Sequence, residues 1–217
     1  MNFIDDIALY LPQYLSSKDK DALRKELKDF PTDGTKDTIY TASLNTAEYL
    51  LQGDGINEMA YLYFPKTDIK NVPAILLSNT CDMSLENPRM NGGCRILYAP
   101  LINFEKYTNM LRTKFKDAEN QKRIDNHLKD IKDQVVTQAL YLPKGGSLQY
   151  DAIVFFDRAI SIPLDRNIVN ELCAKRLFSF SNFGFYLFLL KISIHFTRIQ
   201  EKIDRGSGID LGLNQTA

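Results

Sequence analysis

The sequence has few of the residues that would identify its chemistry directly. Its 217 residues include only three cysteines, Cys81, Cys94 and Cys173, and two histidines, His127 and His195. No two cysteines have the short spacing of a zinc site or a redox motif, so we expect neither a metal nor a cofactor. An odd and sparse set of cysteines is also typical of a reducing compartment.

An excess of charge and a long apolar run are missing too. Lysine and arginine total 27 and aspartate and glutamate total 27, so the net charge is 27 − 27 = 0 and no overall positive field attracts nucleic acid. The first 15 residues carry two acidic side chains and Pro12, unlike the basic start and apolar core of a signal peptide. The apolar run at 183–196 is interrupted by Lys191 and His195 and is shorter than the roughly 20 residues that cross a bilayer. We therefore expect a cytoplasmic protein that does not enter the membrane.

Apolar and aromatic residues, by contrast, are plentiful. The chain is 44% hydrophobic, with 11 tyrosines and 13 phenylalanines. A chain of this length buries about 70% of the surface that it exposes when unfolded. The sequence therefore predicts a packed core that needs no disulfide or metal.

The pattern of apolar residues and turn signals predicts an α+β fold. Helices are expected at 3–10, 16–30, 104–139, 164–178 and 183–205. Strands are expected at 38–42, 59–64, 74–77, 95–99, 140–142 and 149–156, with a polar loop at 65–72. Several short strands bounded by turns are typical of a small antiparallel barrel. We predict an N-terminal helical region at 1–37, a barrel at 38–180 with a helical insertion at about 104–139, and a C-terminal helix and tail at 181–217.

The most distinctive stretch is SNTCD, residues 78–82, where polar side chains directly follow an apolar strand. Its members are Ser78, Asn79, Thr80, Cys81 and Asp82. Polar residues at strand ends usually serve turns, so caps and backbone hydrogen bonds are the favoured interpretation. The alternative is a binding or active site in which Cys81 is a nucleophile, and its base would have to be His127 or His195.

Three further residues are candidates for binding. Arg89 lies in the turn-rich stretch 87–93, and Asp157 with Arg158 ends a strongly apolar strand. Asp157 and Arg158 would either contact a phosphate or carboxylate, or cap and pair with each other at a turn.

Three pieces of the chain, in order, resemble the PemK/MazF family of toxin-like small barrels. The pieces are GDGINEMAYLYFPKTDIKNVPAILLSN at 53–79, RILYAPLI at 95–102 and DAIVFFDRAISIPLDRNI at 151–168. The resemblance implies an SH3-like barrel, a homodimer, and a groove for single-stranded RNA beside residues 78–82. It also implies a bacterial toxin–antitoxin or defence system with an antitoxin-like protein partner. SNTCD itself resembles a signature of little-characterised bacterial proteins.

The resemblance breaks at the positions that carry the family's chemistry. The family's ribonucleases use an arginine just before the Pro-Ala step and a serine or threonine after the third strand. Here Val72 precedes Pro73, and the hydroxyl position falls at Ile102 or Asn103. Lys70 could reach a phosphate, but only as a point charge.

The sequence therefore favours a divergent, non-ribonucleolytic binding or regulatory protein of this family. A metal-independent endoribonuclease with a site rebuilt from Lys70, Cys81, Asp82 and Arg95 is the first alternative. A cysteine-dependent hydrolase that uses Cys81 is the second.

Overall fold

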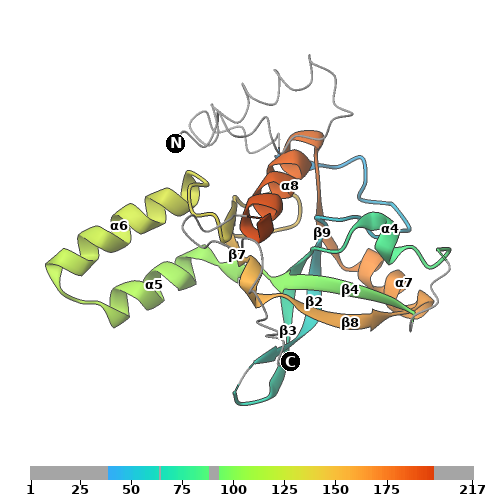
Figure 1. Ribbon diagram of the computed structural model, residues 1–217, viewed down its shortest axis with the longest axis horizontal. Helices are drawn as coiled ribbons and strands as arrows, with labels where there is room; N and C mark the ends of the chain where they lie inside the picture. The colour runs from blue at the N-terminus through green and yellow to red at the C-terminus, as the bar shows by residue number, and fades with distance from the viewer. Residues whose placement is uncertain (1–38, 64, 88–92, 198–217) are drawn as a thin grey trace, which may run out of the picture.

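The computed structural model describes residues 39–63, 65–87 and 93–197 (Figure 1). The helices expected at 3–10 and 16–30, the tail after 197, and Arg89 lie outside these residues. Among the described helices, none is both long and apolar enough to cross a membrane.

The fold is α+β, as predicted, and is built on a six-stranded sheet in which every ladder is antiparallel. Its order is β1-β9-β2-β3-β4-β8. The strands are β1 (Tyr40–Thr41), β9 (Arg176–Phe180), β2 (Gly55–Tyr63), β3 (Asp68–Leu76), β4 (Cys94–Pro100) and β8 (Ile160–Leu164). A smaller sheet has the order β5-β7-β6, with β5 (Ile102–Asn103), β7 (Ala152–Phe155) and β6 (Ala139–Leu142). In the described residues no ladder joins the edge strands β1 and β8, so the expected closed barrel is not seen.

Five α-helices and one 3-10 turn accompany the described strands. They are α4 (Thr80–Met83), α5 (Phe104–Lys114), α6 (Ala118–Lys132), η1 (Phe156–Arg158), α7 (Arg166–Ala174) and α8 (Asn182–Thr197). The insertion is a pair of helices that projects from the sheets (Figure 1). Asn103 caps α5 and Asp117 caps α6, each by accepting a backbone N–H bond of 2.9 Å.

Several predicted elements differ from the structure: the helices expected at 104–139 end at Lys132, the strand expected at 149–156 is limited to β7, and β8 was not predicted. Two further differences have a common cause. The expected loop at 65–72 is mostly strand, because β3 begins at Asp68 and pairs with β2 from Tyr63 back to Met59. The expected helix at 164–178 is shorter, since α7 ends at Ala174 and β9 follows. In both cases pairing with a neighbouring strand decides the conformation of residues whose local pattern is ambiguous.

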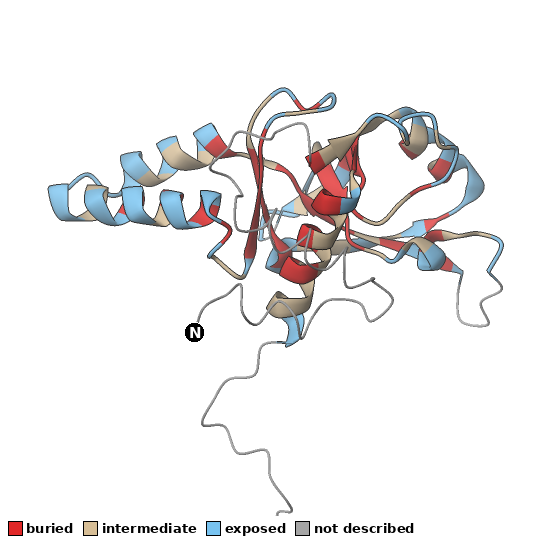
Figure 2. Cartoon of the chain, turned by 90° about the horizontal axis from the view of Figure 1, so that it is seen from above, coloured by how far each residue is buried: buried red, intermediate tan, exposed pale blue. Residues whose placement is uncertain are grey.

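The core has three parts: one lies between the two sheets and α8, one between the six-stranded sheet and α4 with α7, and one between the small sheet and the α5–α6 pair. Figure 2 shows exposed residues along the projecting α5–α6 pair. On α8, Phe183, Leu187 and Leu190 are buried, and Ile194 is partly buried against the same cluster. Close packing also explains one glycine: a Cβ on Gly55 would lie 2.2 Å from the ring of Phe178.

Candidate functional site: a tyrosine groove

Three side chains of the SNTCD stretch accept hydrogen bonds from backbone N–H groups. The Ser78 hydroxyl accepts a 2.7 Å hydrogen bond from the backbone of β4, and the Asn79 side chain accepts the N–H of Cys81 at 2.9 Å to cap α4. The Thr80 hydroxyl accepts the backbone N–H of Gln52 at 3.0 Å. Hydrogen bonds of this kind hold a turn in place, which supports the interpretation of the stretch as a turn.

Cys81 is exposed in this turn, and the structure places the two histidines elsewhere. His127 lies on α6, where its Nε2 is 3.0 Å from the hydroxyl of Tyr107. His195 lies on α8 with its ring centroid 5.6 Å from that of Phe156. Figure 1 shows α6 and α4 on opposite sides of the molecule. In the described residues, no cluster of three or more His, Cys, Asp or Glu side chains could hold a metal.

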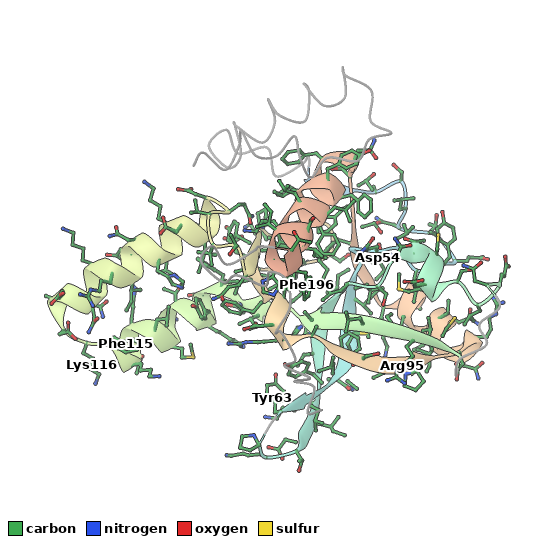
Figure 3. All side chains as sticks on the ribbon, in the orientation of Figure 1. Asp54, Tyr63, Arg95, Phe115, Lys116 and Phe196 are labelled. Atoms are coloured by element: carbon green, nitrogen blue, oxygen red, sulfur yellow. The ribbon has the colours of Figure 1, made fainter. Side chains whose placement is uncertain are left out.

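The residues of the rebuilt ribonuclease site lie on different elements. Cys81 and Asp82 lie in α4. Arg95 lies on β4, where its guanidinium donates to the hydroxyl and carbonyl oxygens of Ser161 at 3.1 and 2.9 Å. Lys70 lies on the projecting β2–β3 hairpin. Figure 3 shows Arg95 well separated from Tyr63, the ring over which the Lys70 ammonium lies.

A cavity of about 630 Å³ lies between this hairpin, the start of β5 and η1. We call it the tyrosine groove, after Tyr61 and Tyr63; Val72, Ile102, Asp157 and Arg158 also line it. The two tyrosine rings meet edge to face with centroids 4.9 Å apart. Tyr63 is 41% exposed, so part of its ring is open to a ligand.

Two cations flank the tyrosines. The Lys70 Nζ lies 5.7 Å from the Tyr63 ring centroid, and the Arg158 Cζ lies 4.7 Å from that of Phe155. The Tyr61 hydroxyl donates to the backbone oxygen of Arg158 at 3.2 Å. Within the described residues, neither cation makes a side-chain hydrogen bond or ion pair, so their donors are available to a ligand.

Charges from η1 act on the Tyr61 hydroxyl. Burial raises the pKa of Tyr61, while the charge of Arg158 lowers it and those of Tyr63 and Asp157 raise it. With its pKa raised, Tyr61 is a neutral hydrogen-bond donor at neutral pH.

Val72 and Ile102, where the resemblance implies catalytic groups, both line the tyrosine groove. Both side chains are apolar and can neither stabilise negative charge nor move a proton. The tyrosines were missed as site residues. The predicted strand places both tyrosines on one face. The sequence alone did not predict that Tyr61 pairs with Lys70 and Tyr63 with Asp68, because these pairs depend on the register of the hairpin.

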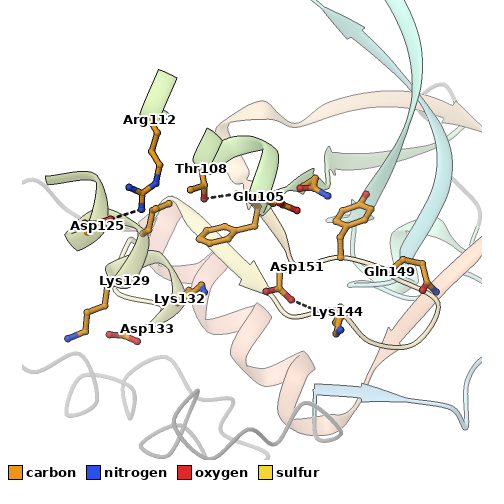
Figure 4. A pocket seen from close by; sticks show the side chains of 14 residues that line it. Glu105, Thr108, Arg112, Asp125, Lys129, Lys132, Asp133, Lys144, Gln149 and Asp151 are labelled. Carbon is orange, nitrogen blue, oxygen red and sulfur yellow. Dashed lines mark hydrogen bonds and ion pairs between the residues drawn. The ribbon is translucent and has the colours of Figure 1, made fainter. Parts of the chain in front are cut away.

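A second cavity, of about 890 Å³, lies between the α5–α6 pair and residues 144–151 (Figure 4). Its charged side chains are of both signs, and several already form ion pairs or hydrogen bonds. Arg112 pairs with Asp125 at 2.7 Å, and the Asp151 carboxylate accepts the Tyr141 hydroxyl at 2.8 Å and the Lys144 N–H at 2.9 Å. This lining selects no ligand class.

A buried polar cluster, also missed from the sequence, surrounds Asp54. Its carboxylate accepts the Arg176 Nε at 3.0 Å and the Ser179 hydroxyl at 2.6 Å, and the Arg176 guanidinium also donates to backbone oxygens of Leu44 and Ala47. Burial raises the pKa of the Asp54 carboxyl, against the opposing effects of the Ser179 hydrogen bond and the Arg176 charge. The cluster holds the segment that precedes β2 against β9, and it leaves no donor for a ligand.

No family model, curated protein or solved structure matches this chain.

Proposed function

We propose that the chain is a divergent PemK/MazF-like protein that binds single-stranded RNA in the tyrosine groove without cleaving it. The observation that carries this proposal is the combination of a partly exposed tyrosine pair with two cations that make no ion pair in the described residues, Lys70 and Arg158. Aromatic faces stack on unpaired bases of any sequence, and cations beside them contact the backbone phosphates. The apolar Val72 and Ile102 support binding rather than cleavage, because they supply no catalytic group at those positions.

One observation favours the endoribonuclease alternative. Asp157 and Arg158 both line the tyrosine groove, and a carboxylate with a guanidinium can provide a base and charge stabilisation. Catalysis also needs a fixed geometry, and in the described residues no hydrogen bond holds the exposed Asp157 carboxylate in one rotamer. We therefore place binding ahead of cleavage.

The SH3-like topology, the cytoplasmic location and the partners are part of the same proposal. After β8 the chain returns through α7 so that β9 pairs with β2, which supports an SH3-like arrangement of these strands. The free thiols Cys81, Cys94 and Cys173 support a cytoplasmic location. A homodimer and an antitoxin-like partner in a bacterial toxin–antitoxin or defence system follow from the resemblance, and sedimentation tests the dimer directly.

The test is binding of a fluorescent single-stranded RNA of mixed sequence in EDTA, followed by anisotropy and by gel. We expect the wild type to bind and leave the RNA intact. Tyr63→Ala should weaken binding by about 10- to 100-fold, the loss expected for one stacked base. Tyr49→Ala is the matched control, since Tyr49 is 55% exposed but lies outside the tyrosine groove.

The outcomes separate the hypotheses. Binding that depends on Tyr63 but not on Tyr49, with intact RNA, supports the proposal. Cleavage that disappears in Asp157→Asn identifies the endoribonuclease instead. A folded wild-type protein that shows no binding overturns both.

A further inference from the structure

The ring of Phe155 connects η1 to the inserted helices. The Arg158 guanidinium lies over this ring, with Cζ 4.7 Å from its centroid. The ring of Tyr107, from α5, packs against the same ring at an interplanar angle of 61° and a centroid distance of 5.5 Å. Phe155 itself is only 6% exposed, so it is a fixed support for both side chains.

Tyr107 is linked in turn to α6. Its hydroxyl lies 3.0 Å from the Nε2 of His127. If the tyrosine donates this bond, the neutral histidine carries its proton on Nδ1; if Nε2 donates, the tyrosine proton is free. In either tautomer the pair retains one polar hydrogen for a third partner.

The charge of Arg158 acts on both of its tyrosine neighbours. Both Arg158 and Asp157 act on the Tyr61 hydroxyl, in opposite directions. On Tyr107, burial raises the pKa and the charge of Arg158 lowers it. The Arg158 guanidinium therefore acts on both hydroxyls, and the shared support on Phe155 brings it close to Tyr107.

We infer that Arg158, Tyr107 and His127 form a subsite for a phosphate group, at the junction of η1 with the inserted helices. A guanidinium binds two phosphate oxygens at once, and the tyrosine–histidine pair supplies a further donor. The phosphate would come either from an RNA strand or from a free phosphate monoester. The inference rests on the proposed function only for the first of these sources. With RNA bound, the insertion extends the tyrosine groove rather than covering it.

The chain offers a direct probe, because it contains only two histidines. The ring signals of His127 and His195 are followed by NMR at fixed pH during titration with inorganic phosphate, beside a sodium chloride titration of equal ionic strength. We expect a saturable shift of His127 with phosphate alone, and no shift of His195, which packs on Phe156.

Three variants sharpen the titration. Tyr107→Phe keeps the ring on Phe155 and removes the hydroxyl, so it should raise the apparent Kd for phosphate about tenfold. Arg158→Gln should abolish the saturable shift. Tyr49→Ala, at an exposed tyrosine outside the tyrosine groove, should leave phosphate binding unchanged.

The result distinguishes failure of the subsite from failure of the proposed function. A His127 shift that does not saturate, or that is the same in Tyr107→Phe and Arg158→Gln, overturns the subsite even if RNA binds. A saturable shift together with RNA binding that Tyr107→Phe weakens supports an RNA phosphate as the ligand. A saturable shift without any RNA binding supports a site for free phosphate monoesters, and the proposed function is then wrong.

Discussion

Arg176 and Arg158 lie in polar clusters of opposite character. The Arg176 side chain is 2% exposed, and its guanidinium donates to the Asp54 carboxylate and to several backbone oxygens. Arg158 is exposed, lies on the ring of Phe155, and makes no side-chain hydrogen bond within the described residues. The same side chain thus stabilises the fold in one cluster and is free to bind a ligand in the other.

The difference lies in what happens when each cation is removed. A buried charge is tolerated only while its partner and hydrogen bonds are present, so loss of Arg176 would leave the Asp54 carboxylate unpaired in the interior. An exposed cation is already solvated, so the loss of Arg158 leaves no buried charge without a partner. The comparison predicts opposite outcomes for the same substitution.

The largest expected effect is on stability at the buried cluster. Arg176→Gln should lower the free energy of unfolding by about 3–5 kcal/mol, the range for breaking one side of a buried ion pair. The measurement is urea unfolding, followed by far-UV circular dichroism.

Arg158→Gln is the matched control for this substitution and should lower the free energy of unfolding by less than about 1 kcal/mol, the value of an exposed cation–π contact. Equal losses in the two variants would contradict the comparison, because they would make Arg158 structural.

A buried cation without a carboxylate sharpens the comparison further. Lys191 on α8 is 0% exposed and its ammonium donates to the backbone oxygens of Gln134 and Val136 at 2.7 Å each. Burial lowers its pKa from 10.5 to about 7. Between these two values the unfolded chain binds more protons than the folded protein, so the free energy of unfolding should rise with pH from about 7 to about 10.

The contribution of Lys191 to this rise is at most about 1.4 kcal/mol per pH unit. It is isolated by urea unfolding of the wild type and of Lys191→Met at several pH values between these limits, with a reductant present. The variant should be less stable, because the carbonyl oxygens of Gln134 and Val136 lose their donor. Its free energy of unfolding should also change less with pH than that of the wild type. Parallel curves would show that Lys191 does not titrate in this range.

The sequence predicted the α+β class and most elements because these depend on local patterns of apolar residues and turns. It did not predict the Asp54–Arg176 pair, whose members are separated by 122 positions and meet only when β9 pairs with β2. The tyrosine groove was missed for a similar reason. Tyr61 and Tyr63 looked like ordinary strand residues, and only the fold brings Arg158 beside them.

In the SNTCD stretch the local pattern favours caps and backbone hydrogen bonds, and Ser78, Asn79 and Thr80 make them around the start of α4. The smallest expected effect lies here. Ser78→Ala removes the acceptor of the Leu97 N–H bond of 2.7 Å and should lower the free energy of unfolding by about 1–2 kcal/mol. RNA binding should be unchanged, because Ser78 does not line the tyrosine groove.

Cys81→Ser is the control for Ser78→Ala in the same turn. Cys81 is exposed, and within the described residues its backbone makes its hydrogen bonds, with the Asn79 and Asn87 side chains. The substitution should therefore change stability by less than about 0.5 kcal/mol and leave RNA binding intact. A loss of binding in Cys81→Ser at unchanged stability would move the functional site from the tyrosine groove to α4 and revive the interpretation of Cys81 as a reactive residue.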